Sequence, residues 1–385
     1  MFATYVTDNF RPLRTVEPDP PFDDLEPMLT GARVVAIGES AHWVREYTLF
    51  RYRLLRALAA RGGPVVFALE SGFSEGQLVS DWLSGGSGDV RSVADEGITY
   101  RMGQCAEMRD QLTWMRSAGV GYAGLDLPGS AATPLPALHR LPAGLPFVED
   151  LITRTEKFAS EHALHTYAAY AALAETDRDA LTARWASLSA WADVRVPGLD
   201  PVVRHEIRLG ALFDQMLRGH ATRSALAAAA RDRAMAETVL WLLERHPDAV
   251  IVLGAANGHL QRTPLSVPGL EVSPAGHHLA SHLGPEYLAV AVTAVGGRTP
   301  ARRPAPSAPG GVEVTVVDLE PPRADAIEAA LPGRLGVLDL REARGLPDAP
   351  TAIRVQHTYV EGPVAEAYDF VVGVPSTTVA GFLAG

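Results

Sequence analysis

Lysine is almost absent from this chain, since Lys157 is the only one among its 34 basic residues. Schiff-base chemistry needs a reactive lysine, and a P-loop needs one beside its glycines. Lys157 instead lies in a polar segment with a helical pattern, so neither class is expected. The other basic residues are arginines scattered along the sequence, and the formal net charge is −11. The chain therefore lacks the electrostatic footprint of a nucleic-acid-binding protein, and we expect no nucleic-acid partner.

Cysteine and long apolar runs are also scarce. Cys105 is the single cysteine, which excludes an internal disulfide framework and a multi-cysteine zinc or iron–sulfur site. No run approaches the ~18 to 20 apolar residues that a membrane helix needs, and the N-terminal segment lacks the basic and apolar regions of a secretion signal. With 47% hydrophobic residues, the sequence predicts a globular, cytoplasmic protein with a large core and no membrane partner.

Short β-branched runs alternate with segments of helical periodicity along much of the chain. The run RVVAIG at 33–38 precedes a helical pattern at 45–60, and PVVFAL at 64–69 precedes another at 73–83. Such alternation predicts an α/β fold with a mixed, largely parallel sheet flanked by helices. A helix is also expected at 106–117, and further strands at 121–125, 249–254, 287–295, 312–319, 336–340, 351–355 and 368–372.

The sequence also suggests how these elements are grouped. Residues 1–30 are rich in Pro and Asp and are expected to form an N-terminal arm. Residues 31–146 and 247–385 form the predicted α/β catalytic core, while 147–246 reads as an all-helical insertion that roofs a cleft. The Pro/Gly-rich segment 296–311 is expected to be a loop.

Polar residues follow four of the predicted strands directly. Because the carboxyl ends of parallel strands open into a crevice, these residues are expected to face one cleft. A single Glu or His just after a strand often only caps a helix, and a single Asp there more often has a structural than a catalytic role. The residues at the four strand ends together carry more charge than a fold needs, which is typical of an active site. The residues are Glu39, His42, Trp43, Arg45 and Glu46 after the first strand, Glu70 after the second, Asp126 after 121–125, and Asn257 and His259 after 249–254.

The blocks around these positions resemble the erythromycin esterase family. The N-terminal blocks read VVAIGESAHWVREYTLF and VVFALESGFSEGQLVSDWL, with Gly-Glu-x-x-His after the first strand and Leu-Glu after the second. The C-terminal blocks read RDRAMAETVLWLLERHPDAVIVLGAANGHL and YDFVVGVP. Their order and spacing cover the chain from about residue 31 to 376, which makes the resemblance specific.

The resemblance implies that His42 is a general base that activates water against a macrolide lactone carbonyl. Glu39, Glu70 and His259 would surround it with Arg45 nearby, and His259 or Arg45 would stabilise the oxyanion. Histidine suits this role because it titrates near neutral pH and a neighbouring carboxylate can orient its ring. The expected ligand is a bulky natural product without any cofactor, and the oligomeric state is left open. Trp43, Glu46, Asp126 and Asn257 are expected to contact the substrate.

Two departures from the family pattern put the substrate in question. The family has Gly after the first His and His before the Asn of Asn-x-His, whereas this chain has Trp43 and Ala256. These changes should reshape the pocket, so erythromycin itself is not carried over as the substrate. A natural-product tailoring enzyme, which uses the same His and Glu residues for cyclisation, dehydration or acyl transfer, is therefore the alternative.

Two rival sites can be read from the same segments. Ser74 lies in a literal G-x-S-x-G and, with Asp126 and His259, gives the order of a hydrolase triad. It lies beyond the sharp turn after the strand, however, and no HGGG-like loop precedes it, so Ser74 is predicted to be dispensable. A metal could be held by His42, His259, Glu39 and Glu70, but without H-E-x-x-H the spacing is weak, and no metal is expected. The arginines of the insertion are expected on helix surfaces, with Arg231 or Arg233 able to reach the cleft.

Overall fold

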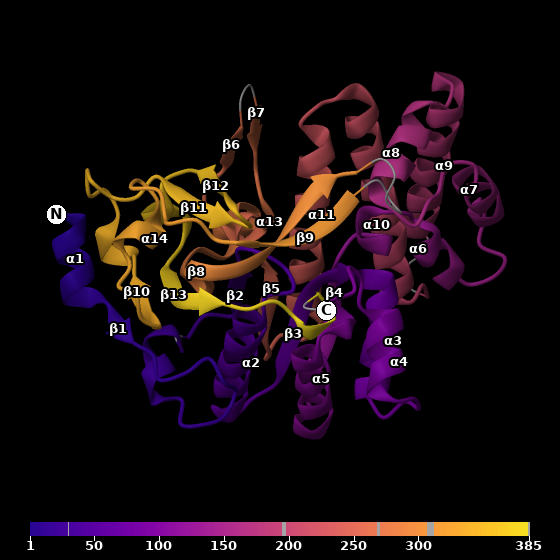
Figure 1. Ribbon diagram of the computed structural model, residues 1–385. Helices are drawn as coiled ribbons and strands as arrows, with labels where there is room; N and C mark the ends of the chain where they lie inside the picture. Colours follow the sequence, from indigo (N-terminus) through magenta and orange to yellow (C-terminus); the bar gives the residue numbers. More distant parts are fainter. Residues whose placement is uncertain (30, 195–197, 268–269, 306–311, 384–385) are drawn as a thin grey trace.

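A parallel sheet forms the centre of the molecule (Figure 1). The computed structural model describes the chain except residues 30, 195–197, 268–269, 306–311 and 384–385. Most strand residues are buried, as expected for β-branched runs covered on both faces. In sheet order the parallel strands are β13 (Phe370–Thr377), β8 (Tyr287–Pro304), β2 (Val34–Glu39), β5 (Val250–Ala256), β3 (Val65–Gly72) and β4 (Gly121–Asp126).

Antiparallel strands complete one side of this sheet. β10 (Gly336–Asp339) pairs with β13, and β1 (Arg11–Pro12) pairs with β10, so the N-terminal arm is attached to the core through the sheet. β9 (Val312–Asp318) pairs with the far half of β8. The predicted mixed, largely parallel sheet is therefore confirmed.

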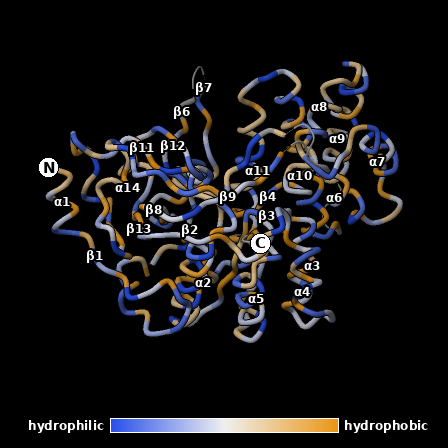
Figure 2. The backbone as a smooth tube through the Cα atoms, viewed as in Figure 1, coloured by the Kyte–Doolittle hydropathy of each residue, from blue (hydrophilic) through white to orange (hydrophobic). Residues whose placement is uncertain are grey.

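Helices cover both faces of the sheet. In Figure 1, α2 (Arg45–Ala60) and α5 (Ala106–Ala118) lie below the sheet, and α11 (Leu226–Arg245) and α13 (Ala275–Leu283) lie above it. Alternate residues of each strand enter separate cores, as the two-residue period of a strand requires. Polar and apolar residues alternate along the covering helices (Figure 2), and α2 is buried along most of its length.

The described segment between β4 and β5 is mainly helical. Its helices bury a core of their own, in which Phe73 and Leu127 from the sheet side also pack. The helices are α6 (Leu135–Arg140), α7 (Val148–Thr155), α8 (Ala163–Ala171), α9 (Glu175–Val194), α10 (Pro201–Thr222) and α11.

None of the helices in the described part of the chain combines the length and the apolar character that a membrane-spanning helix needs.

Shorter elements complete the structure. The remaining helices are α1 (Phe2–Asn9), α3 (Phe73–Leu83), α4 (Val90–Gly97), α12 (Asn257–Leu260), α14 (Ile327–Ala330) and α15 (Val364–Ala367). Two small hairpins are formed by β6 (Leu265–Val267) with β7 (Leu270–Val272) and by β11 (Ala352–Val355) with β12 (Thr358–Glu361).

The loop expected at 296–311 is wrong for its first part. β8 continues to Pro304 and forms a ribbon with β9, with Arg298 opposite Asp318 and Pro304 opposite Val312. An edge ribbon tolerates proline at positions whose N–H is not needed by the ladder, so the Pro-rich composition did not prevent a strand. Residues 306–311 lie outside the described residues. The ribbon extends from the sheet toward the helical insertion (Figure 1).

Candidate active site

The ends of β2, β3 and β5 bring two histidines to one carboxylate oxygen. The Nε2 atom of His259 lies 3.5 Å from Oε1 of Glu70, and the Nε2 atom of His42 lies 3.8 Å from the same oxygen. The Glu70 side chain is only 3% exposed. Two predicted histidines and a predicted carboxylate therefore face one another, because all three lie at or just after the carboxyl ends of neighbouring strands on one edge of the sheet.

Glu39 sets the orientation of the His42 ring. Its Oε1 atom lies 2.6 Å from Nδ1 of His42, and its Oε2 atom accepts a hydrogen bond of 3.0 Å from Arg51. Burial alone would raise the pKa of Glu39, but Arg51 and His42 hold it below its ordinary value. In a neutral ring the proton is then on Nδ1, where the carboxylate accepts it, so Nε2 presents its lone pair to the site.

A glycine makes room for this arrangement. A Cβ at Gly254 in β5 would lie 2.7 Å from Cδ of Arg51, so any larger residue would displace the arginine. Arg51 is buried, with its guanidinium 5.8 Å from the Phe67 ring. The close approach of β5 to α2 thus lets a helix arginine reach the end of β2.

Glu70 is held as a carboxylate by its surroundings. Its Oε2 atom accepts a 2.7 Å hydrogen bond from the backbone N–H of Ala256, and its Oε1 atom accepts one of 3.0 Å from Arg231. Burial opposes ionisation, but electrostatic interactions with His259, His42 and Arg231 outweigh it and lower the pKa of Glu70 to about 2. The group is therefore an anion at neutral pH.

His259 is held as a cation. Its Nδ1 atom lies 2.8 Å from Oδ1 of Asp232 on α11, and that oxygen also accepts from the N–H of Ala275. Burial opposes protonation, yet Asp232 and Glu70 outweigh it and raise the pKa of His259 to about 9. The two histidines thus differ in their partners: one faces Glu39 and the other faces Asp232.

Arg231 links the site to the end of β4. It donates to Asp126 at 2.6 Å, to Glu70 at 3.0 Å and to the hydroxyl of Tyr100 at 3.1 Å. Burial opposes its charge, but Asp126, Tyr100 and Glu70 raise the pKa of Arg231 further above its ordinary value. Asp126 is therefore linked to Glu70 through Arg231, an arginine of α11.

Other predicted residues lie around this group in different ways. The Arg45 side chain is 41% exposed and pairs with Glu17 and Glu107, so the structure does not bring it to the histidines. Glu46 accepts hydrogen bonds from Thr378 at the C-terminal end of β13. The Asn257 side chain bonds both backbone groups of Val292 and ties α12 to β8.

Trp43 does border the site. Its indole lies edge-on to the His42 ring, with ring centres 6.1 Å apart, and its N–H donates to the carbonyl of Tyr100. The Tyr100 ring stacks on the His42 ring, with ring centres 5.7 Å apart. His42 is therefore in contact with two aromatic side chains.

The Ser74 hydroxyl is directed away from the histidines. It is buried in α3 and donates a 2.6 Å hydrogen bond to Glu206 of α10. Burial raises the pKa of Glu206 to about 7. Ser74 thus connects the insertion to the core.

Within the described residues no set of three or more His, Cys, Asp or Glu side chains is arranged to hold a metal ion.

Several site residues were missed by sequence reasoning. Arg51 lies on α2 with Arg45 but is buried, in the space beside Gly254. Asp232 comes from a helix far along the chain, and Tyr100 follows no strand. The one available signal was the adjacent pair Arg231 and Asp232 within the RDRAMAE block.

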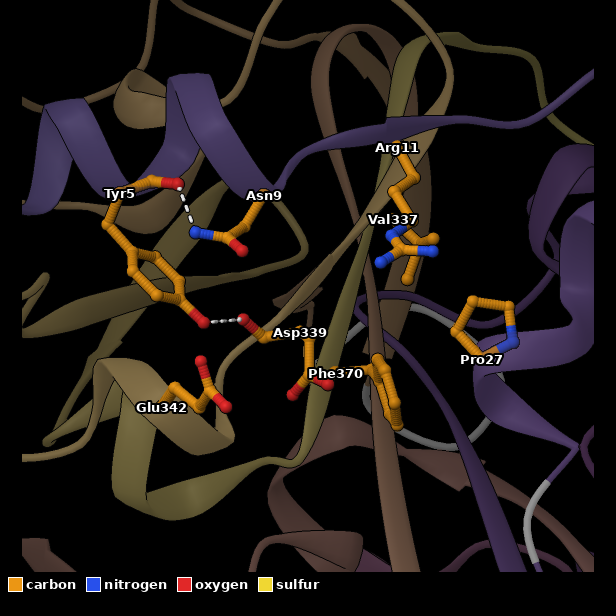
Figure 3. A pocket seen from close by; sticks show the side chains of 8 residues that line it. All are labelled: Tyr5, Asn9, Arg11, Pro27, Val337, Asp339, Glu342 and Phe370. Atoms are coloured by element: carbon orange, nitrogen blue, oxygen red, sulfur yellow. Dashed lines mark hydrogen bonds between the residues drawn. The ribbon is translucent and has the colours of Figure 1, made fainter.

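A hollow of about 150 Å³ lies at a different place (Figure 3). It is at the antiparallel side of the sheet, where β1 and β10 meet, and it contains no histidine. Its walls include Tyr5, Asn9, Arg11, Asp339, Glu342 and Phe370. The hollow is therefore separate from the site at the ends of β2, β3 and β5.

The fold and the site define a class: an α/β enzyme with two histidines, each oriented by its own carboxylate, at the carboxyl edge of a parallel sheet. The profile described as erythromycin esterase matches residues 60–377, and the chain belongs to the erythromycin esterase family. It is accordingly an ester-bond hydrolase.

Two relatives support this assignment over nearly the whole chain, and a solved structure shares the fold. The chain is 25% identical to erythromycin esterase type II of Escherichia coli, over 98% of each protein. It is 27% identical to erythromycin esterase type I of Escherichia coli, over 92% of this chain and 93% of the relative. A mutant of the erythromycin esterase EreC in its open conformation has the same fold, with a TM-score of 0.82 and 24% identity over 97% of this chain and 99% of the other.

Proposed function

We propose that the protein hydrolyses an ester or lactone with water activated by His42. The observation that carries the proposal is the convergence of two Nε2 atoms on one Glu70 oxygen, while each Nδ1 is held by a separate carboxylate. In this proposal one histidine accepts a proton and the other presents positive charge. General-base activation of water and stabilisation of the oxyanion both accelerate ester hydrolysis.

The reaction follows from these roles. Nε2 of His42 takes a proton from the attacking water as the water oxygen bonds to the carbonyl carbon, and Glu39 stabilises the imidazolium that forms. The negative charge that develops on the carbonyl oxygen is stabilised by the protonated His259, with Arg231 contributing to the positive field. When the C–O bond breaks, His42 returns the proton to the leaving alkoxide. The products are a carboxylic acid and an alcohol.

We further propose a bulky natural product as the substrate. The curated relatives are named as erythromycin esterases, which supports a macrolide or a similar lactone. Trp43 adds an indole beside His42, and Ala256 leaves a methyl group at the end of β5, so the pocket differs from the family pattern. A substrate other than erythromycin is therefore favoured.

A product analysis tests the proposal. The purified protein is incubated with a panel of macrolides and simple esters in isotopically labelled water, with His42→Asn as the control. Hydrolysis by direct water attack predicts a ring-opened product heavier by one water from a lactone, and a separate acid and alcohol from a simple ester, with one labelled oxygen in the new carboxylate. Formation of these products should be strongly reduced with His42→Asn.

Two outcomes would contradict hydrolysis. Loss of water from a substrate, or a new ester without labelled oxygen, would instead indicate a tailoring reaction such as dehydration, cyclisation or acyl transfer. No conversion of any lactone or ester would remove the hydrolytic proposal.

A further inference from the structure

The ribbon of β8 and β9 places an arginine over the two aromatic rings that flank His42. The guanidinium carbon of Arg302 lies 4.9 Å from the centre of the Trp43 ring and 5.6 Å from that of Tyr100. Both rings also contact the His42 imidazole. The positive charge is therefore one aromatic layer away from the proposed general base.

The backbone fixes Arg302 in this position. Its N–H donates a 3.1 Å hydrogen bond to the side chain of Gln356, and the N–H of Gln356 donates a 2.7 Å bond to the carbonyl of Ser40. Ser40 belongs to the loop between Glu39 and His42. The ribbon and the histidine loop are thus joined through one glutamine, so Arg302 keeps its place relative to His42.

Three residues of this assembly adopt left-handed backbone conformations. The φ angles are 61° for Trp43, 56° for Tyr100 and 54° for Gln356. Bulky residues rarely adopt such angles, and strained residues cluster at sites where a particular side-chain direction is needed. Since glycine would fit these angles without strain, the two aromatic side chains and the glutamine point to a requirement for those groups.

The charge of Arg302 has no acidic partner in the described part of the chain. Its side chain is exposed, and its recorded contacts are the two rings. The adjoining residues 306–311 read PSAPGG and contain no Asp or Glu. The next residue, Arg303, is instead paired with Glu313 at 2.7 Å. Cation–π contact leaves the guanidinium N–H groups able to bind an anion.

We propose that Arg302 determines specificity by binding an anionic group of the substrate, so that the preferred substrates are esters or lactones that carry a carboxylate near the scissile bond. This inference rests on the proposed hydrolysis and adds the substrate class to it. Trp43 and Tyr100, which both contact His42, also contact the guanidinium of Arg302, and its fork of N–H donors matches a carboxylate.

Two esters of equal chain length test the inference. Para-nitrophenyl hexanoate is neutral, and the mono-para-nitrophenyl ester of adipic acid adds one carboxylate. The wild-type protein should favour the adipate ester in kcat/KM. Arg302→Gln should raise KM for the adipate ester by roughly 10- to 100-fold, the range for hydrogen bonds to charged groups, with kcat nearly unchanged. The hexanoate ester should be affected by less than about twofold.

Arg303→Gln is the matched control, because consecutive side chains of a strand point to opposite faces. It should leave the kinetics of both esters unchanged. Equal losses for both esters in Arg302→Gln, or no preference of the wild-type protein for the adipate ester, would overturn the inference.

A binding measurement separates this inference from the proposed function. Isothermal titration with benzoate and with neutral benzamide requires no turnover. Selective weakening of benzoate binding in Arg302→Gln supports the anion site even if the wild-type protein hydrolyses neither ester, in which case the proposed function fails alone. Equal benzoate binding by Arg302→Gln and the wild-type protein overturns the inference.

Discussion

Glu70 is the residue whose substitution should most clearly separate charge from shape in the site. Glu70→Gln retains the size of the side chain and an acceptor for the Ala256 N–H, but removes the negative charge between His42, His259 and Arg231. The pKa of Glu70 is lowered from 4.5 to about 2, and one pKa unit corresponds to about 1.4 kcal/mol. The charged form is thus stabilised by about 3 kcal/mol in the folded protein.

The sign of the pH dependence follows from that lowered pKa. The stabilisation of the folded protein by ionised Glu70 is fully present at pH values above 4.5, the pKa of this carboxyl in the unfolded chain, and it is lost as the pH falls through 2. Urea unfolding at pH 7 should therefore show Glu70→Gln to be less stable by about 3 kcal/mol, with the difference narrowing below pH 4.5. The pKa of His259 should also fall from about 9 toward its ordinary value, because Glu70 helps to hold its proton. Imidazole signals followed by NMR would measure this change.

Activity should fall by roughly 10²-fold in folded Glu70→Gln, the usual loss for one well-placed electrostatic group. Glu237→Gln is a suitable control, since Glu237 on α11 also has a pKa near 2 but is paired with Arg208 and Arg233. The control should lose some stability and keep its activity. Equal activity in Glu70→Gln and the wild-type protein would refute the reasoning.

Four further substitutions test other parts of the account. Asp232→Asn should lower the pKa of His259 from about 9. The alkaline limit of activity in a pH–rate profile should therefore move to lower pH. An unchanged limit would mean that the titration of His259 does not set it. Ser74→Ala should lower the free energy of unfolding by about 1 kcal/mol through the lost hydrogen bond to Glu206, and its activity should persist. Serine-directed phosphonates should not label the wild-type protein. Labelling at Ser74 would favour covalent catalysis. Arg51→Gln should lower the free energy of unfolding by about 3 to 5 kcal/mol because it breaks a buried ion pair. Arg45→Gln should lower it by less than about 1 kcal/mol because the ion pairs of Arg45 are partly exposed. Similar losses for the two variants in urea unfolding would contradict this contrast.

The strands could be predicted because their side chains are buried on both faces. Three of these strands are predicted from runs made almost entirely of apolar residues, at 33–38, 64–69 and 249–254. Each observed strand begins within one residue of its predicted start. The ribbon of β8 beyond Gly296 could not be predicted, since proline and arginine there reflect an edge position rather than a buried one.

The site could be predicted where a residue follows its own strand. Glu39, His42, Glu70 and His259 are placed by strand ends, and the structure brings them together. Residues on helices are different, because a helix presents side chains in all directions and only tertiary packing decides which one turns inward. Arg51 rather than Arg45 reaches Glu39, and Asp232 reaches His259, through contacts that no local pattern contains.

The proton transfer by His42 is the central claim, and one kinetic comparison tests it most directly. His42→Ala is compared with the wild-type protein on an ester that the wild-type protein hydrolyses, after circular dichroism has shown that both are folded. The account predicts that kcat falls by ~10² to 10⁴ because the general base for water is lost. An unchanged kcat in folded His42→Ala would contradict the assignment of His42 as the base.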